Sequence, residues 1–96
     1  FTKSLAMELG PSNIRVNAIQ PGVVAGERVD RIISAKAKAL GITFEAYREQ
    51  FVSTISLRRM LSTQDIANMA LFLATPAGQN ISGQALSVCG DHGMIA

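Results

Sequence analysis

The sequence has 96 residues, of which 48% are hydrophobic and 17% charged, and nine Lys and Arg face seven Asp and Glu. This composition is typical of a globular domain and excludes a disordered or low-complexity chain. No apolar run reaches the roughly 20 residues that span a bilayer, and the sequence does not open on a signal-peptide pattern. The single cysteine, Cys89, excludes an internal disulfide. We therefore expect a cytoplasmic protein without a membrane partner.

The positive charges are scattered along the chain and are not interleaved with aromatic residues. This pattern argues against a nucleic-acid partner, because nucleic-acid surfaces concentrate basic side chains on one face or stripe. We expect no nucleic acid to bind.

A first helix is predicted from Phe1 to Leu9, where apolar residues recur at helical spacing. Gly10-Pro11 is expected to end it, with Gly10 in the left-handed conformation. A short strand is predicted over 14–19, where apolar and polar residues alternate, and Pro21-Gly22 is expected to end this strand.

Helical spacing then predicts helices over 26–40 and 44–54, separated at Gly41. Ser62 or Thr63 is expected to cap a further helix that continues through Ala74. Its body is apolar on almost every side, so we expect it to be buried against a sheet on one side and a partner subunit on the other. A last strand is predicted over 84–88.

The order helix, strand, helices, strand is typical of a parallel sheet with crossover helices. Two strands rarely stand alone, and parallel sheets are covered on both faces. We therefore expect an α/β fold in which these strands form the C-terminal edge of a doubly wound parallel sheet that is incomplete in this sequence.

Several segments carry a resemblance to one family. Ile14-Arg15-Val16-Asn17-Ala18-Ile19-Gln20-Pro21-Gly22 resembles the IRVNxIxPG strand and turn of the short-chain dehydrogenase/reductase family. Upstream, Phe1–Leu9 is similar to the end of the helix that begins with the family's catalytic Tyr-x-x-x-Lys. Similar motifs follow in the family's order at Arg59-Met60, Asp65-Ile66-Ala67, Leu71-Phe72-Leu73-Ala74 and 81–88. The resemblance implies that residues 1–96 are the C-terminal part of a single Rossmann-fold domain.

The resemblance implies an NAD(P)-dependent oxidoreductase that interconverts an alcohol and a carbonyl on a small molecule, with NAD or NADP as cofactor. In the family, the turn after Pro-Gly lies along the nicotinamide ring, which implies cofactor contacts at Pro21, Gly22, Val23 and Val24. Glycine permits a close backbone approach, and cofactors bind at the ends of parallel strands. The family often has Thr four residues after this glycine, where this sequence has Gly26.

Residues 26–56 resemble the family's substrate lid, which makes Arg28, Tyr47 and Phe51 candidates for the substrate pocket, together with Ile32 and Phe44. Helical packing explains the same apolar spacing equally well. The segments 66–74 and 85–88 resemble the elements through which family members pair, which implies a homodimer or homotetramer.

The catalytic motifs of the family are absent from this sequence. Tyr47 is the only tyrosine, and the residue four positions later is Phe51 rather than lysine. Without an acid, a base or a glycine-rich phosphate loop, we expect the 96-residue chain alone to be inactive. The alternative is that the chain is a truncated, non-catalytic module for oligomerisation or interaction.

Cys89, Asp91 and His92 lie close together in the sequence. Three different ligand types within four residues do not match a zinc site, so we expect no metal. His92 is expected to be an exposed tail residue, and Cys89 a small side chain that fills the end of a strand.

Overall fold

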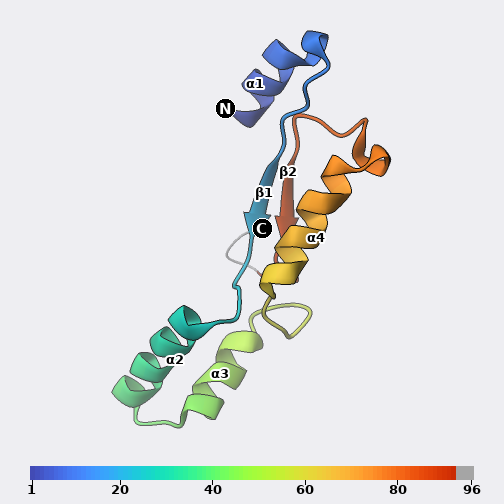
Figure 1. Ribbon diagram of the computed structural model, residues 1–96. Helices are drawn as coiled ribbons and strands as arrows, with labels where there is room; N and C mark the ends of the chain where they lie inside the picture. Colours follow the sequence, from blue (N-terminus) through green and yellow to red (C-terminus); the bar gives the residue numbers. More distant parts are fainter. Residues whose placement is uncertain (93–96) are drawn as a thin grey trace. The chain divides into compact units, whose positions relative to one another are not determined.

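The computed structural model describes residues 1–92, which fall into two compact units. The strand unit contains residues 1–21 and 64–88, and the helical unit contains residues 22–63 together with the segment that begins at Cys89. Figure 1 shows the order of the elements along the chain. Within the described residues, no helix has the length and hydropathy needed to cross a membrane.

The strand unit is built around a parallel pair of short strands, β1 (Ala18–Pro21) and β2 (Ala85–Val88), with Ala18 opposite Ala85. It also holds the helices α1 (Thr2–Leu9) and α4 (Thr63–Ala74) and the 3-10 turns η1 (Gly10–Ser12) and η2 (Pro76–Gly78). The two strands lie side by side, with α4 alongside them (Figure 1). The predicted α/β class with parallel strands and helical crossovers is thus confirmed.

The predicted strand over 14–19 begins only at Ala18. Just before it, Arg15 donates hydrogen bonds from Nη1 to two carbonyl oxygens, at the end of α4 and in η2, over 2.6 and 2.8 Å. The Asn17 side chain likewise bonds to the backbone of 81–84. Side-chain bonds therefore replace part of the backbone ladder here, which the alternation of apolar and polar residues does not reveal.

The end of α1 also differs from the prediction. Gly10 has a helical φ of −54°, and the left-handed residue is Asn13, with a φ of 60°. The Asn13 N–H donates to the Gly10 carbonyl and the Ile14 N–H to the Leu9 carbonyl, which is the bond pattern of a Schellman motif. Because Pro11 fits the first turn of the 3-10 helix, the left-handed residue is Asn13, three residues after the expected Gly10.

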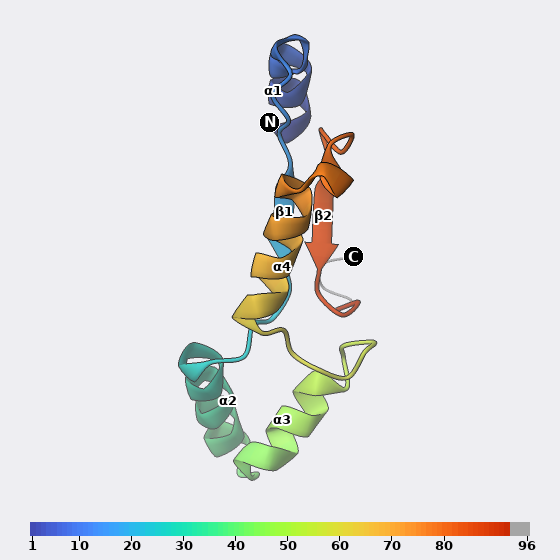
Figure 2. The same ribbon diagram turned by 45° about the vertical axis from the view of Figure 1, so that its right-hand side comes forward.

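The helical unit contains α2 (Glu27–Leu40) and α3 (Phe44–Val52), which confirms the two helices predicted for this stretch. Gly41 ends α2 in the left-handed conformation, with a φ of 69°. Thr43 then caps α3, because its Oγ1 accepts a hydrogen bond from the Ala46 N–H at 3.1 Å. The short connection makes α2 and α3 a helical hairpin (Figure 2).

The core of the helical unit is small. Ile33 and Ile55 are each 1% exposed, and Ala37, Leu61 and His92 are also buried. The prediction of an exposed His92 is therefore wrong. The physical reason is a backbone bridge between His92 and Ile55, which folds the segment after Cys89 back against the helical unit.

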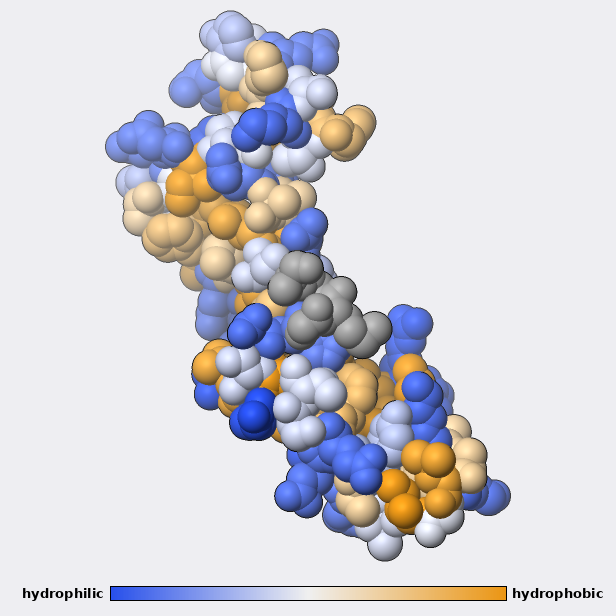
Figure 3. All heavy atoms as spheres, turned by 180° about the vertical axis from the view of Figure 1, so that it is seen from behind, coloured by the Kyte–Doolittle hydropathy of each residue, from blue (hydrophilic) through white to orange (hydrophobic). Residues whose placement is uncertain are grey.

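The expectation that α4 is buried on several sides is not met within this chain. None of its residues is buried, and Leu71 and Phe72 are 65% and 45% exposed. Ile66, Met69 and Leu73 form a half-buried stripe at helical spacing. A pair of four-residue strands is too narrow to cover more of a helix whose body is mostly apolar. Apolar side chains remain visible on the surface of this unit (Figure 3).

The left-handed turn at Gly41 gives a test of the helical hairpin. A Cβ at this position meets nothing within 4 Å, so the cost of Gly41→Ala is conformational rather than steric. We expect Gly41→Ala to lower the free energy of unfolding by about 1 kcal/mol in urea denaturation. Gly41→Asn is the matched control and should lose less, because Asn tolerates this conformation, as Asn13 does. Equal losses of unfolding free energy in both variants would contradict the left-handed conformation at Gly41.

Candidate functional site

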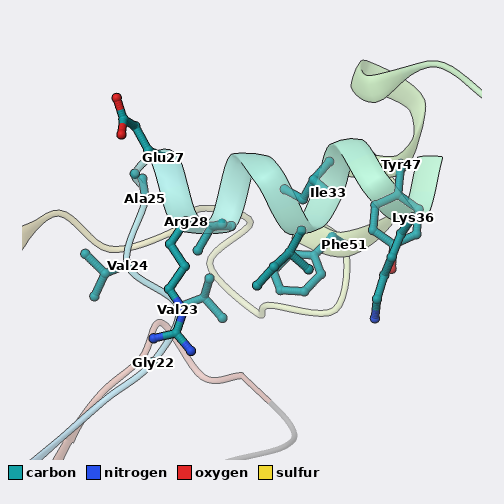
Figure 4. Close-up of a pocket in the computed structure, with 13 residues that line it drawn as sticks. Gly22, Val23, Val24, Ala25, Glu27, Arg28, Ile33, Lys36, Tyr47 and Phe51 are labelled. Atoms are coloured by element: carbon teal, nitrogen blue, oxygen red, sulfur yellow. The ribbon is translucent and has the colours of Figure 1, made fainter. Parts of the chain in front are cut away.

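The helical unit contains a cavity of about 590 Å³ along one side of α2 (Figure 4). Its walls come from three pieces of chain: the segment that enters α2, α2 itself and one side of α3. The lining residues are Gly22, Val23, Val24, Ala25, Gly26, Glu27, Arg28, Val29, Ile32, Ile33, Lys36, Tyr47 and Phe51.

The cavity brings together residues that the sequence analysis assigned separately to a cofactor and to a substrate. Gly22–Val24, expected at the nicotinamide, line the same space as Arg28, Tyr47 and Phe51, expected at the substrate. Pro21 is the last residue of β1 and does not line this cavity.

Two further lid candidates separate in the structure. Ile32 lines the main cavity. Phe44 lines a different hollow, together with residues of the first half of α2 that include Asp30 and Arg31. The sequence does not predict that Phe44 lies outside the main cavity, because Phe44 follows the same helical spacing as Tyr47, which lines it.

The segment before α2 is held by a parallel backbone bridge between Val24 and Leu61. The Leu61 N–H donates to the Val23 carbonyl, and the Ala25 N–H donates to the Leu61 carbonyl, each at 2.8 Å. In a parallel bridge of this pattern, the N–H and C=O of the central residue point away from the partner. The backbone groups of Val24 therefore face away from Leu61.

Gly22 is required by packing within the helical unit. A Cβ placed on it would lie 2.7 Å from both Cα and Cβ of Cys89, closer than real Cβ atoms come. The missing side chain is thus explained by the approach of Cys89. Cys89 itself is half-buried.

Phe51 links the cavity to the buried His92. The two rings stack with centroids 6.0 Å apart, and His92 is 4% exposed. Its Nδ1 is buried and has no hydrogen-bond partner among residues 1–92. The sequence does not predict the burial of His92, because nothing in the local pattern around Cys89 signals that the chain turns back onto Ile55.

Two cations lie on the side of α2 that faces the cavity. Arg28, Ile32 and Lys36 follow one another at intervals of four residues, so they share one side of the helix. In Figure 4 the Arg28 head lies near Gly22 and Val23, and Lys36 lies at the other end with Tyr47. The carboxylate of Glu27 points away from them (Figure 4). Lys36 was also missed, although the spacing from Arg28 is a readable signal.

No metal centre forms in the described part of the chain, where no three His, Cys, Asp or Glu side chains come together. His92 and Cys89 therefore do not combine with Asp91 into a site. The chemistry of this cavity is that of an apolar space with two cationic heads and free backbone groups.

Comparison with known proteins identifies the family. The profile of the family described as enoyl-(acyl carrier protein) reductase matches residues 1–94. A 3alpha-hydroxysteroid dehydrogenase from Mediterraneibacter gnavus is 42% identical over 90 residues, which cover 94% of this chain and 32% of that protein. The chain belongs to the short-chain dehydrogenase/reductase family.

Solved structures agree with this assignment. A short chain dehydrogenase family protein from Francisella tularensis superposes with a TM-score of 0.83 at 31% identity, over 95% of this chain and 38% of that one. A variant of the actinorhodin polyketide ketoreductase, solved with NADPH, gives a TM-score of 0.82 at 28% identity, over 97% and 36%. Similar structures hold NADPH or NADH. The chain spans about a third of the length of the curated relatives it matches.

The approach of Gly22 to Cys89 makes a stability prediction. Gly22→Ala should lower the free energy of unfolding by about 1–3 kcal/mol, because the new Cβ overlaps the Cys89 backbone. Gly26→Ser is the matched control: a Cβ there meets nothing within 4 Å, and serine is a good N-cap for α2. Urea denaturation followed by circular dichroism measures both. A Gly22→Ala protein as stable as Gly26→Ser would contradict the contact.

Proposed function

We propose that the protein carrying this sequence is an NAD(P)-dependent oxidoreductase that interconverts an alcohol and a carbonyl on a small molecule. The observation that carries the proposal is the cavity in which Gly22–Val24 meet Arg28, Tyr47 and Phe51. Membership of the short-chain dehydrogenase/reductase family supports it, as do related structures that hold NADPH or NADH. The proposed cofactor is NAD or NADP.

In this proposal, Val24 is the residue that holds the nicotinamide carboxamide. Its N–H and C=O point away from Leu61, so both a donor and an acceptor are available to an amide group. Val23 adds an apolar surface beside them, and Gly22 positions the segment through its contact with Cys89. Pro21, at the end of β1, completes the proposed cofactor contact.

Residues 26–56 are proposed to cover the substrate, with residues 1–96 forming part of one Rossmann-type domain. Arg28 and Tyr47 would contact the substrate from the two helices of the hairpin. Phe51 is held by its stack on His92, which makes it a fixed part of the wall. The walls exclude water from the substrate, and the polar groups orient it.

Held by Val24, a reduced nicotinamide would supply the hydride for the carbonyl carbon of the substrate in the reductive direction. The carbonyl oxygen then requires a proton, and Tyr47 is not placed by sequence to act with a lysine, because Phe51 follows it after four residues. The proposal therefore assigns this proton to a tyrosine outside these 96 residues. The residues of this chain bind and orient, and the chain alone is expected to be inactive.

The exposed apolar side of α4 supports a homodimer or homotetramer through 66–74 and 85–88. Leu71 and Phe72 are large apolar side chains that the strand unit leaves uncovered. The same observation favours the second candidate function, a non-catalytic oligomerisation or interaction module. The free Cys89 supports a cytoplasmic, reducing compartment for either function.

The activity is tested by mixing the full protein that carries this sequence with NADPH or NADH and a panel of ketones. We expect the absorbance of the reduced nicotinamide to fall with at least one ketone and the corresponding alcohol to appear. Tight self-association with neither turnover nor binding of NAD(P)H would contradict the enzyme and support the interaction module.

The cofactor contact is tested by restoring a side chain at Gly26, where the family often has Thr. Gly26 is extended, with a φ of 162°, and has open space, so threonine fits there. We expect Gly26→Thr to bind NAD(P)H about fivefold more tightly, the value of one added hydrogen bond of about 1 kcal/mol. Gly26→Val, of the same shape but without the hydroxyl, is the control in a fluorescence titration. Equal affinities for Thr and Val would contradict the contact.

A further inference from the structure

The cavity is lined by two cationic side chains, Arg28 and Lys36. Arg28 and Lys36 project from the same side of α2 into it, whereas Glu27, the one acidic residue among the described residues of the lining, points away (Figure 4). In the described part of the chain, neither cation forms an ion pair with a carboxylate. A ligand in this space would therefore meet two cationic side chains that no carboxylate of the described residues pairs.

Most of the other side chains that line the cavity are apolar. Val29, Ile32 and Ile33 come from α2, and Phe51 comes from α3. Ile33 is 1% exposed, so the floor of the cavity belongs to the packed core. A ligand that fits this lining has an apolar body, because a polar body would lose its hydration without gaining partners.

The two cations occupy different ends of the space. Lys36 follows Arg28 by eight positions, which corresponds to about 12 Å along a helix. Arg28 lies near Gly22 and Val23, where the nicotinamide is proposed to bind, and Lys36 lies with Tyr47 at the opposite end (Figure 4). A group held by Lys36 is thus remote from the reacting carbon.

We propose that the cavity selects a carbonyl substrate with an apolar body and an anionic group at the far end, held by Lys36. A carboxylate and a phosphate monoester share this chemistry. Arg28 adds to the attraction at the end nearer Val24. The inference rests on the proposed function for the reaction itself, but the recognition of the anion is a property of the cavity and is measured separately.

The experiment uses the full protein and compares Lys36→Met with Lys38→Met. Both variants remove one positive charge from α2, but only Lys36 lines the cavity. Calorimetry measures the binding of decanoate, decyl phosphate and neutral decanol, and kinetics compares 9-oxodecanoate with its methyl ester. Thermal unfolding of each variant confirms that it is folded.

We expect the wild-type protein to bind decanoate about fivefold more tightly than decanol, the upper range for one partly exposed ion pair. Lys36→Met should remove this preference, and Lys38→Met should keep it. The kcat/KM for 9-oxodecanoate should exceed that for its methyl ester by about the same factor. Lys36→Met should remove this difference too, and Lys38→Met should keep it. A stronger preference for decyl phosphate than for decanoate assigns the anion as a phosphate.

Three results overturn the inference: equal binding of decanoate and decanol by the wild type, equal effects of the two lysine variants, or a loss confined to NADPH affinity in Lys36→Met. These results are distinct from failure of the proposed function. Ketone reduction without a preference for acids keeps the enzyme and removes the inference. Lys36-dependent binding of decanoate without any turnover keeps the inference about the cavity and removes the reaction.

Discussion

The backbones of Gly22 and Cys89 lie so close together that no side chain fits between them. This contact, together with the bridge from Val24 to Leu61, holds the segment that enters α2 at two points. The cavity depends on that segment, because it forms the wall opposite the helical hairpin. A single glycine thus fixes the position of the backbone groups to which we assign the nicotinamide.

The chemistry of the cavity follows from the register of α2. Ile33 and Ala37 anchor the helix in the core, which leaves Arg28, Ile32 and Lys36 on the side that lines the cavity. The same helix therefore provides both the packing of the helical unit and the charge at the site. Selectivity for an anionic substrate would then need no loop of its own, since it comes from helix geometry.

Periodicity and family resemblance predicted the α/β class, the parallel strands and each α-helix. Besides Ile32 and Phe44, seven residues were expected at the cofactor or the substrate, and six of them line the cavity: Gly22, Val23, Val24, Arg28, Tyr47 and Phe51. Pro21 does not line it, and Lys36, which does, was not predicted. Among the predictions that failed, one had a local cause and another depended on a contact between distant segments. Asn13 replaced Gly10 at the left-handed position because of a local 3-10 turn, and His92 was buried by pairing with Ile55.

The most direct test of the central claim is a crystal structure of the full protein with NADPH or NADH bound. Our account predicts that the nicotinamide carboxamide lies within hydrogen-bond distance of the N–H and C=O of Val24, with the ring against Val23. A nicotinamide bound away from Val24, with these backbone groups open to solvent, would contradict the account.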